Sequence, residues 1–211
     1  MMLLWGIMCA LWQAQSSGKG QVVDAAITDG SVYASSLLWM IHNSSHATDQ
    51  VGVSWTDGAA PWNDTYVCSD GHYINICALE PKFYRLLLDR LGLSQKDCFE
   101  HQWQEQSWPQ ARVVLTQKFA SETRQYWCDL LEGSDACFAP VLNFTEATQH
   151  LHHIARKAFI ELDGVTQPAP APKMDQNKGL LKSAPRPGQD TVNVLAQLGL
   201  LPERIAQLQQ T

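Results

Sequence analysis

The residue of this sequence best placed to do chemistry is Glu80, a carboxylate at the junction between a predicted β-hairpin and a predicted helix. Pro81 suits the first turn of a helix and Gly92 suits the position just past its last turn, so the sequence predicts a helix from Pro81 to about Leu91. The dipole of such a helix stabilises a carboxylate at its amino-terminal end, where the carboxylate can cap the helix or act on a neighbouring group. From the pattern alone, a helix cap is the commoner role.

The β-hairpin before this helix is predicted from the dipeptide Asp70-Gly71. Both central residues of a type I′ turn adopt positive φ, and Asp-Gly is among the pairs that tolerate it best. Because side chains alternate between the two faces of a strand, the turn also predicts which residues share a face. A two-residue turn at this dipeptide pairs Ser69 with His72, Val67 with Ile74 and Thr65 with Ile76. The second strand of the hairpin then leads the chain to Glu80.

The cysteines and histidines predict neither a disulfide nor a metal site. No C-x-x-C pair occurs among the six cysteines, so zinc-ribbon and thioredoxin-like motifs are absent. Cys68 and Cys77 lie too far apart along the expected hairpin to bond, and Cys128 and Cys137 are expected to be ordinary buried thiols. The closely spaced histidines lack the Glu, Cys or paired carboxylates of a metal site; they are His42, His46, His150, His152 and His153. This cysteine usage is typical of a reducing compartment, and we expect a cytoplasmic protein.

Composition indicates a globular protein with one large domain, or one domain plus part of a second. The chain has 211 residues, of which 45% are apolar and 17% are charged, and these shares are ordinary for a folded protein. The formal charge is −6 and the Lys and Arg residues are scattered, so no nucleic-acid partner is expected. Residues 1–12 are apolar, but they are too few to span a bilayer and no basic residue precedes them. A buried helix is therefore favoured there over a signal peptide or a membrane segment.

Helix and turn signals divide the chain into four segments. We expect helices in residues 1–45, a polar linker in 46–58, a small α+β domain in 59–150, and a surface strap with two terminal helices in 151–211. Within these segments we expect one helix at 1–16, a second helix that ends near 42, and two more at 109–120 and 123–131. We also expect a strand at 137–142, an extended stretch at 168–172, and two terminal helices that meet at 199–202.

Several segments, in this order along the chain, resemble the alpha-methylacyl-CoA racemases, which belong to the family III CoA-transferases (the CaiB/BaiF superfamily). Cys77-Ala-Leu-Glu-Pro-Lys-Phe-Tyr84 is similar to their G-A-[IL]-E-P-Q-F-Y segment. The other matching segments are Ser16–Ala26, Asp57–Pro61 with Thr65-Tyr66, Trp127-Cys128, Ser134–Leu142 and Pro168–Pro172. The resemblance therefore covers essentially the whole chain.

The resemblance implies an α/β fold that corresponds to the C-terminal part of a family III CoA-transferase. This part holds a small α+β domain with a hairpin, together with remnant helices of a large dinucleotide-fold domain. The racemases are much longer, and their first half binds CoA and carries a His in a G-H-D-like motif and an Asp in a G-D-F-G-G-G-like motif. Neither catalytic residue matches any position here, so we expect a C-terminal fragment that does not turn over substrate alone.

The same resemblance implies roles for three residues of this chain. Racemisation alpha to a thioester needs one group to remove a proton and another to return it on the opposite face, while the enolate charge is stabilised. The family assigns these transfers to the His and the Asp, and Glu80 is implied to accept a hydrogen bond from the His, which sets its tautomer and raises its pKa. Trp62 and Asn63 are implied to border the substrate. Coenzyme A is part of the acyl-CoA substrate, so no separate cofactor or metal is expected; the expected partner is a second copy in an interlocked homodimer, and no membrane is involved.

Three positions depart from the family pattern. Asn63 stands where a Tyr often lines the site, Ala59 replaces the second Gly of a G-G-A-P loop, and Cys77 replaces the Gly before A-[IL]-E-P. We expect the acyl pocket to differ in shape, so the acyl group of the substrate stays open. Two alternatives to a 2-methylacyl-CoA racemase stay open as well. One is a CoA-transferase that moves CoA between carboxylic acids through an Asp nucleophile, and the other is a non-enzymatic dimerisation remnant.

Overall fold

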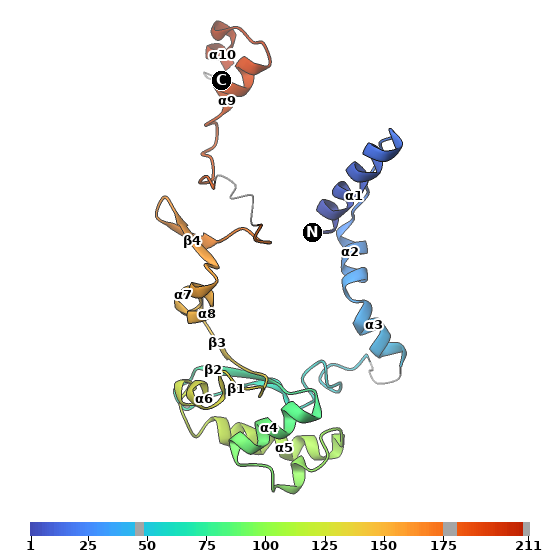
Figure 1. The fold of residues 1–211 in the computed structure, drawn as a ribbon, viewed down its shortest axis with the longest axis vertical. Coiled ribbons are helices and arrows are strands. Elements are labelled where there is room, and N and C mark those ends of the chain that lie inside the picture. Colours follow the sequence, from blue (N-terminus) through green and yellow to red (C-terminus); the bar gives the residue numbers. More distant parts are fainter. Residues whose placement is uncertain (45–48, 175–180, 209–211) are drawn as a thin grey trace. The chain divides into compact units, whose positions relative to one another are not determined.

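The computed structural model describes residues 1–44, 49–174 and 181–208 (Figure 1). The chain divides into two compact units, Met1–Val141 and Leu142–Thr211. The structure is of the mixed α/β class, with small antiparallel sheets, as the sequence predicts. The finer division at residues 45, 58 and 150 stays a prediction.

The first unit begins with three helices, α1 (Met2–Ser17), α2 (Ile27–Ala34) and α3 (Ser36–Asn43). Gly18 ends α1 with a φ of 71°, and its N–H donates to the carbonyl oxygen of Ala14 at 2.8 Å, which is the left-handed cap expected of a glycine. The single helix expected to end near residue 42 is instead two helices that break at Ser35.

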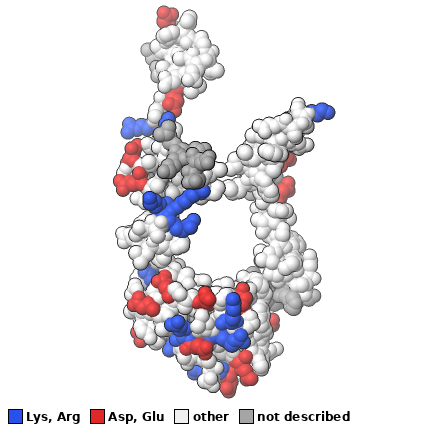
Figure 2. Space-filling view, viewed as in Figure 1, with Lys and Arg blue, Asp and Glu red and all other residues white. Residues whose placement is uncertain are grey.

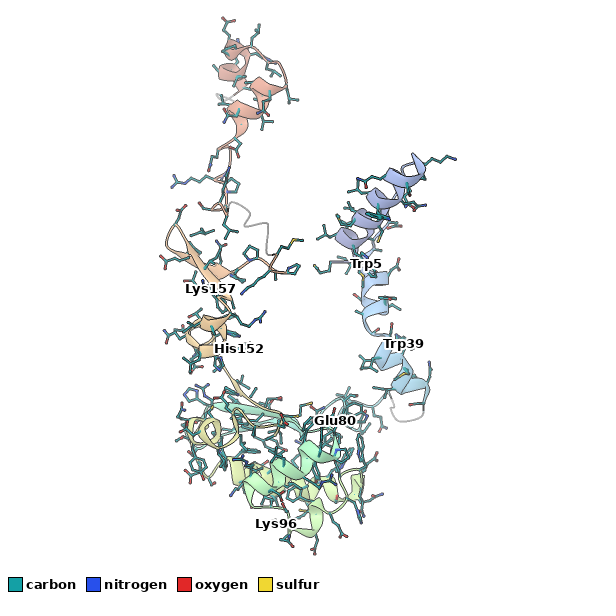
Figure 3. All side chains as sticks on the ribbon, in the orientation of Figure 1. Trp5, Trp39, Glu80, Lys96, His152 and Lys157 are labelled. Carbon is teal, nitrogen blue, oxygen red and sulfur yellow. The ribbon has the colours of Figure 1, made fainter. Side chains whose placement is uncertain are left out.

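The helix predicted at 1–16 is confirmed, but its predicted burial is wrong. None of the residues of α1 is buried, and the side chains of Trp5 and Trp12 are 62% and 77% exposed (Figure 3 labels Trp5). Apolar side chains become buried only where another surface covers them. Few of the described residues lie against α1: Gly20, Gln21 and Val23 line a groove together with its side chains. Within the described ranges, no helix combines the length and apolar character needed to cross a bilayer.

The core of the first unit is built on a three-stranded antiparallel sheet in the order β1 (Asn63–Val67), β2 (Tyr73–Cys77), β3 (Phe138–Val141). The hairpin between β1 and β2 is confirmed, but its predicted register is wrong by one residue. The observed pairs are Thr65 with Asn75, Tyr66 with Ile74 and Val67 with Tyr73. Because a slip of one residue exchanges the faces of a strand, Tyr66, rather than Val67 or Thr65, shares the buried face with Ile74 and Ile76.

The turn of this hairpin explains the shift. The N–H of Cys68 donates to the carbonyl oxygen of His72 at 2.8 Å, and the N–H of Gly71 donates to that of Cys68 at 3.0 Å. Gly71 has a φ of 77°, so the loop has three residues and ends in a glycine bulge, instead of the two-residue type I′ turn. The carboxylate of Asp70 accepts from the backbone N–H groups of His72 and Arg124 at 3.1 and 3.0 Å. A contact with a distant helix therefore fixes the turn.

Helices α4 (Pro81–Leu91), α5 (Trp108–Phe119) and α6 (Arg124–Leu131) pack with the sheet into one body (Figure 1). Two short 3₁₀ turns, η1 (Asp97–Phe99) and η2 (Glu105–Ser107), lie between α4 and α5. The predicted helices at 81–91, 109–120 and 123–131 are confirmed to within one residue at each end. Fully buried side chains of this body are Trp62, Ile74, Ile76, Leu87, Leu91, Leu115, Phe119, Trp127 and Leu131. Each contributes about 1.5–3 kcal/mol of transfer free energy.

The second unit contains α7 (Phe144–Gln149), α8 (Leu151–Ala155), β4 (Phe159–Leu162), β5 (Val165–Pro168), α9 (Thr191–Gln197) and α10 (Pro202–Leu208). Strands β4 and β5 form a hairpin in which Leu162 pairs with Val165. Its central residues, Asp163 and Gly164, have φ values of 50° and 76°, as a type I′ turn requires. The sequence analysis missed this hairpin, whereas the two predicted terminal helices are confirmed as α9 and α10.

Candidate functional site

Glu80 lies between the end of β2 and the start of α4, as the sequence predicts. Its extended backbone (φ −78°, ψ 142°) starts the helix, and its carbonyl oxygen accepts from the N–H groups of Phe83 and Tyr84, both at 3.0 Å. Its side chain, however, makes no capping hydrogen bond, and the residue is exposed (Figure 3). The helix therefore begins without the carboxylate, which stays available for another partner.

The backbone that leads into Glu80 is held by Gln102, a residue that the sequence analysis did not single out. Gln102 is only 9% exposed, and its amide nitrogen donates to the carbonyl oxygens of Ala78 and Leu79, both at 2.9 Å. Its own carbonyl oxygen accepts from the indole nitrogens of Trp62 and Trp108, at 3.1 and 2.9 Å. No sequence pattern marks a glutamine for this role, since only the tertiary contacts bring these four partners together.

Trp62 is in the core and reaches the same junction through its backbone. Its side chain is 1% exposed, and its ring lies 4.9 Å from that of Trp103 and 6.2 Å from that of Trp55, measured between centroids. Its carbonyl oxygen accepts from the N–H of Ala78 at 3.0 Å. The side-chain nitrogen of Asn63, which is half-buried, donates to the carbonyl oxygen of Trp55 at 3.0 Å. The structure thus connects Trp62 to the backbone that leads into Glu80, whereas the side chain of Asn63 binds the loop at Trp55.

The loop before Trp62 is fixed by two charged side chains. The carboxylate of Asp57 accepts from the backbone N–H groups of Gly52 and Ser54 at 3.0 and 2.7 Å. Arg112 on α5 donates to the carbonyl oxygens of Gly58 and Ala59 at 2.5 and 3.0 Å. The same guanidinium forms an ion pair with Asp64 on β1. One arginine therefore connects helix, strand and loop, and its planar fork of donors suits this task.

The thiol of Cys137 lies close enough to the carboxylate of Glu80 for the two groups to interact. The N–H of Cys77 donates to the carbonyl oxygen of Cys137 at 2.9 Å. Burial raises the pKa of Cys137, and the Glu80 carboxylate and the Cys77 thiol raise it further, while Lys82 acts in the opposite direction. Cys128 is buried as predicted, but Cys137 is only half-buried, because it lies at the edge of the sheet opposite the exposed end of β2.

An ionised carboxylate in this position acts as a hydrogen-bond acceptor. It can orient an imidazole by accepting its ring N–H, and it then raises the pKa of that imidazole. In the described part of the chain, which excludes His46, no group of three or more His, Cys, Asp and Glu residues could hold a metal ion.

Comparison with known proteins places these observations in a family. The model of CoA-transferase family III matches residues 1–191. The alpha-methylacyl-CoA racemase of Mus musculus is 37% identical over 212 aligned residues, which cover 99% of this chain and 55% of the relative. The human protein of the same name is 36% identical over 99% of this chain and 55% of its own length. The chain thus spans little more than half the length of these curated relatives.

Solved structures agree on the fold. A hypothetical protein of Mycobacterium tuberculosis superposes with a TM-score of 0.67 at 18% identity, over 90% of this chain and 51% of that one. A CaiB/BaiF family protein of Brucella suis gives a TM-score of 0.67 at 17% identity, over 92% of this chain and 52% of that one. With the family model matched over most of its length, the chain belongs to CoA-transferase family III.

Proposed function

We propose that these residues serve in a 2-methylacyl-CoA racemase, an isomerase that inverts the carbon alpha to a CoA thioester. The observation that carries this proposal is the 37% identity to a racemase along nearly the whole chain. The position of Glu80 supports it, because its carboxylate is exposed and is not used to cap α4. Coenzyme A enters as part of the substrate, so the proposed reaction needs no further cofactor.

In the proposed mechanism, two groups outside this chain exchange the proton. One removes the alpha proton, the enolate charge is stabilised by preorganised donors, and the other group returns a proton on the opposite face. The family pattern gives these transfers to a His and an Asp that match no position here. Glu80 is a positioning residue: its carboxylate accepts the ring N–H of the His, which fixes the tautomer and keeps the other ring nitrogen basic.

Trp62 and Asn63 border the substrate in this proposal by shaping the loop between Trp55 and Pro61, since their side chains are engaged with core and loop atoms. The proposed assembly is a homodimer, and the proposed location is the cytoplasm, where cysteines are typically found as free thiols.

The test uses the chain alone and the chain extended at its amino terminus by the part of the mouse racemase that it does not match. Exchange of the alpha proton of a 2-methylacyl-CoA in deuterated water should stay at the protein-free level with the chain alone and appear with the extended protein. Exchange by the chain alone would overturn the assignment of both transfers to groups outside it. Transfer of CoA to a second carboxylic acid without exchange would favour the transferase instead.

The role of Glu80 is tested in the extended protein with Glu80→Gln. Turnover should fall by about ten- to a thousandfold, because the substitution weakens an orienting hydrogen bond and leaves the transferring groups in place. The melting temperature should not change, since the carboxylate makes no capping hydrogen bond. Glu122→Gln is the matched control, as it alters another exposed carboxylate of the same body. Full turnover in Glu80→Gln would contradict the orienting role.

A further inference from the structure

Cys77 and Cys137 are joined by a backbone hydrogen bond at the edge of the sheet. Strands β2 and β3 pair as far as Ile76 opposite Phe138, and Cys137 comes just before β3 with a φ of 51°. The N–H of Cys77 donates to the carbonyl oxygen of Cys137 at 2.9 Å. This single hydrogen bond brings the backbones of the two residues into direct contact, so their Cα separation is expected to be close to the value of about 5.5 Å found in regular hydrogen-bonded pairs. This separation lies within the range of about 4.4–6.8 Å that disulfides span.

The two thiols are also accessible and close enough to influence each other. Cys77 is exposed and Cys137 is half-buried, and neither is in a disulfide. Burial and the Glu80 carboxylate raise the pKa of Cys137, and the nearby Cys77 thiol adds to that rise. By contrast, Cys68 and Cys128 are buried, and burial raises the pKa of each to about 11. Thiols that are buried and protonated exchange slowly.

We propose that Cys77 and Cys137 form a redox-responsive dithiol, which a low-molecular-weight disulfide such as glutathione disulfide converts into an intramolecular disulfide. The sequence analysis weighed only Cys68 as a partner for Cys77. The hydrogen bond from the N–H of Cys77 to the carbonyl oxygen of Cys137 points to Cys137 instead, because it brings together two cysteines that are about 60 residues apart in the chain.

The exchange takes place in two balanced steps. The thiolate of Cys77 attacks one sulfur of glutathione disulfide, forms a mixed disulfide and releases one glutathione thiolate. The thiolate of Cys137 then attacks the Cys77 sulfur, forms the Cys77–Cys137 bond and releases the second glutathione thiolate. Two protein thiols are oxidised, one glutathione disulfide is reduced to two glutathione molecules, and the two thiol protons pass to the released thiolates. Cys77 reacts first because it is the more exposed of the two, and because burial raises the pKa of Cys137 and so lowers its share of thiolate.

The disulfide would covalently restrain the backbone at the end of β2, from which the chain runs through Ala78 and Leu79 to Glu80. In the racemase proposed above, oxidation of the two thiols would therefore restrict the movement of the backbone segment that carries the positioning carboxylate of Glu80. This consequence rests on the proposed function, whereas the bond itself does not.

The test uses the reduced 211-residue chain, which is incubated with glutathione disulfide at pH 8, blocked with an alkylating agent, and analysed by intact mass and by peptide mapping without reductant. We expect a monomeric product that has lost two hydrogens, with Cys77 linked to Cys137, and a rate of formation that does not depend on protein concentration. A link between Cys77 and Cys68, or a disulfide-bonded dimer, would overturn the proposal.

Three single variants give the controls. Cys137→Ser should stop at one glutathione on Cys77, because no second thiol resolves the mixed disulfide. Cys77→Ser should form no internal bond, and Cys9→Ser should form it as fast as the parent chain. A stable glutathione adduct on Cys77 in the parent chain itself, at the level seen in Cys137→Ser, would show that the two sulfur atoms do not meet, and it would refute the inference.

Discussion

Gln102→Leu should destabilise the first unit by about 2–4 kcal/mol. The substitution removes two hydrogen bonds of 2.9 Å to the carbonyl oxygens of Ala78 and Leu79, at a side chain that is only 9% exposed. Each carbonyl oxygen left without a partner costs about 1–3 kcal/mol, so the two together cost about 2–6 kcal/mol. Burial of the apolar leucine side chain offsets part of this cost. The change in volume is small, so a cavity contributes little.

The measurement is urea unfolding followed by tryptophan fluorescence, since Trp62 and Trp108 donate to the carbonyl oxygen of Gln102 and so report on this site. Gln110→Leu is the matched control: Gln110 is exposed on α5, and the same chemical change there should alter stability by less than about 0.5 kcal/mol. Equal effects of the two substitutions would refute the argument that Gln102 holds the approach to Glu80.

Gln102→Glu provides an independent check with a defined dependence on pH. An ionised carboxylate offers no donor to the two carbonyl oxygens, whereas a protonated one offers a single O–H. The folded-state pKa of the new side chain should therefore be raised. Its stabilising contribution should be present below the unfolded-state pKa of about 4.3 and lost as the pH rises above it. A stability difference from the parent chain that does not change between pH 4 and pH 7 would contradict this account.

Three further predictions concern the rest of the first unit. Amide hydrogens of α1, α2 and α3 should exchange much faster than those of α4, α5 and α6, because only one residue of the first three helices is buried; equal protection would contradict this. Thermal stability should fall as the pH rises above about 9, since burial raises the pKa of Cys68 and Cys128 to about 11 and the unfolded chain releases these protons first; Cys68→Ala combined with Cys128→Ala should flatten that decline. Arg112→Ala should cost about 1–2 kcal/mol in urea unfolding, because two loop carbonyl oxygens and Asp64 lose their donor, and a loss similar to that of Arg90→Ala would contradict it.

Local signals predicted most of the elements around the candidate site, but not the contacts between them. Pro81 and Gly92 bound α4 as expected, because both act within one turn of the helix. The same dipeptide gave opposite results in two places: Asp163-Gly164 forms the two-residue turn, whereas Asp70-Gly71 does not. The loop at Asp70 is bound by a distant segment: the N–H of Arg124 donates to the Asp70 carboxylate, and the N–H of Ser69 donates to the carbonyl oxygen of Glu122. No window of neighbouring residues contains either bond.

The candidate site shows the same division. The segment around Glu80 that resembles the family located the junction between strand and helix. The hydrogen bonds that Gln102 donates to the backbone before Glu80, and those that Arg112 donates to the loop before Trp62, could not be predicted, because only the fold brings these residues together. Glu80 occupies the N-cap position of α4, but the capping hydrogen bond of its side chain, which the pattern favoured, is absent.

The surface of α1, α2 and α3 carries few charges, whereas residues of both signs are scattered over the body formed by the sheet and α4, α5 and α6 (Figure 2). Because α4 begins without the carboxylate of Glu80, substitution at position 80 leaves the folding free energy almost unchanged. Natural selection can therefore act on this side chain for its chemistry alone, with none of the usual exchange of stability for activity. A glutamate retained here among related sequences would thus record a requirement of function and not of folding.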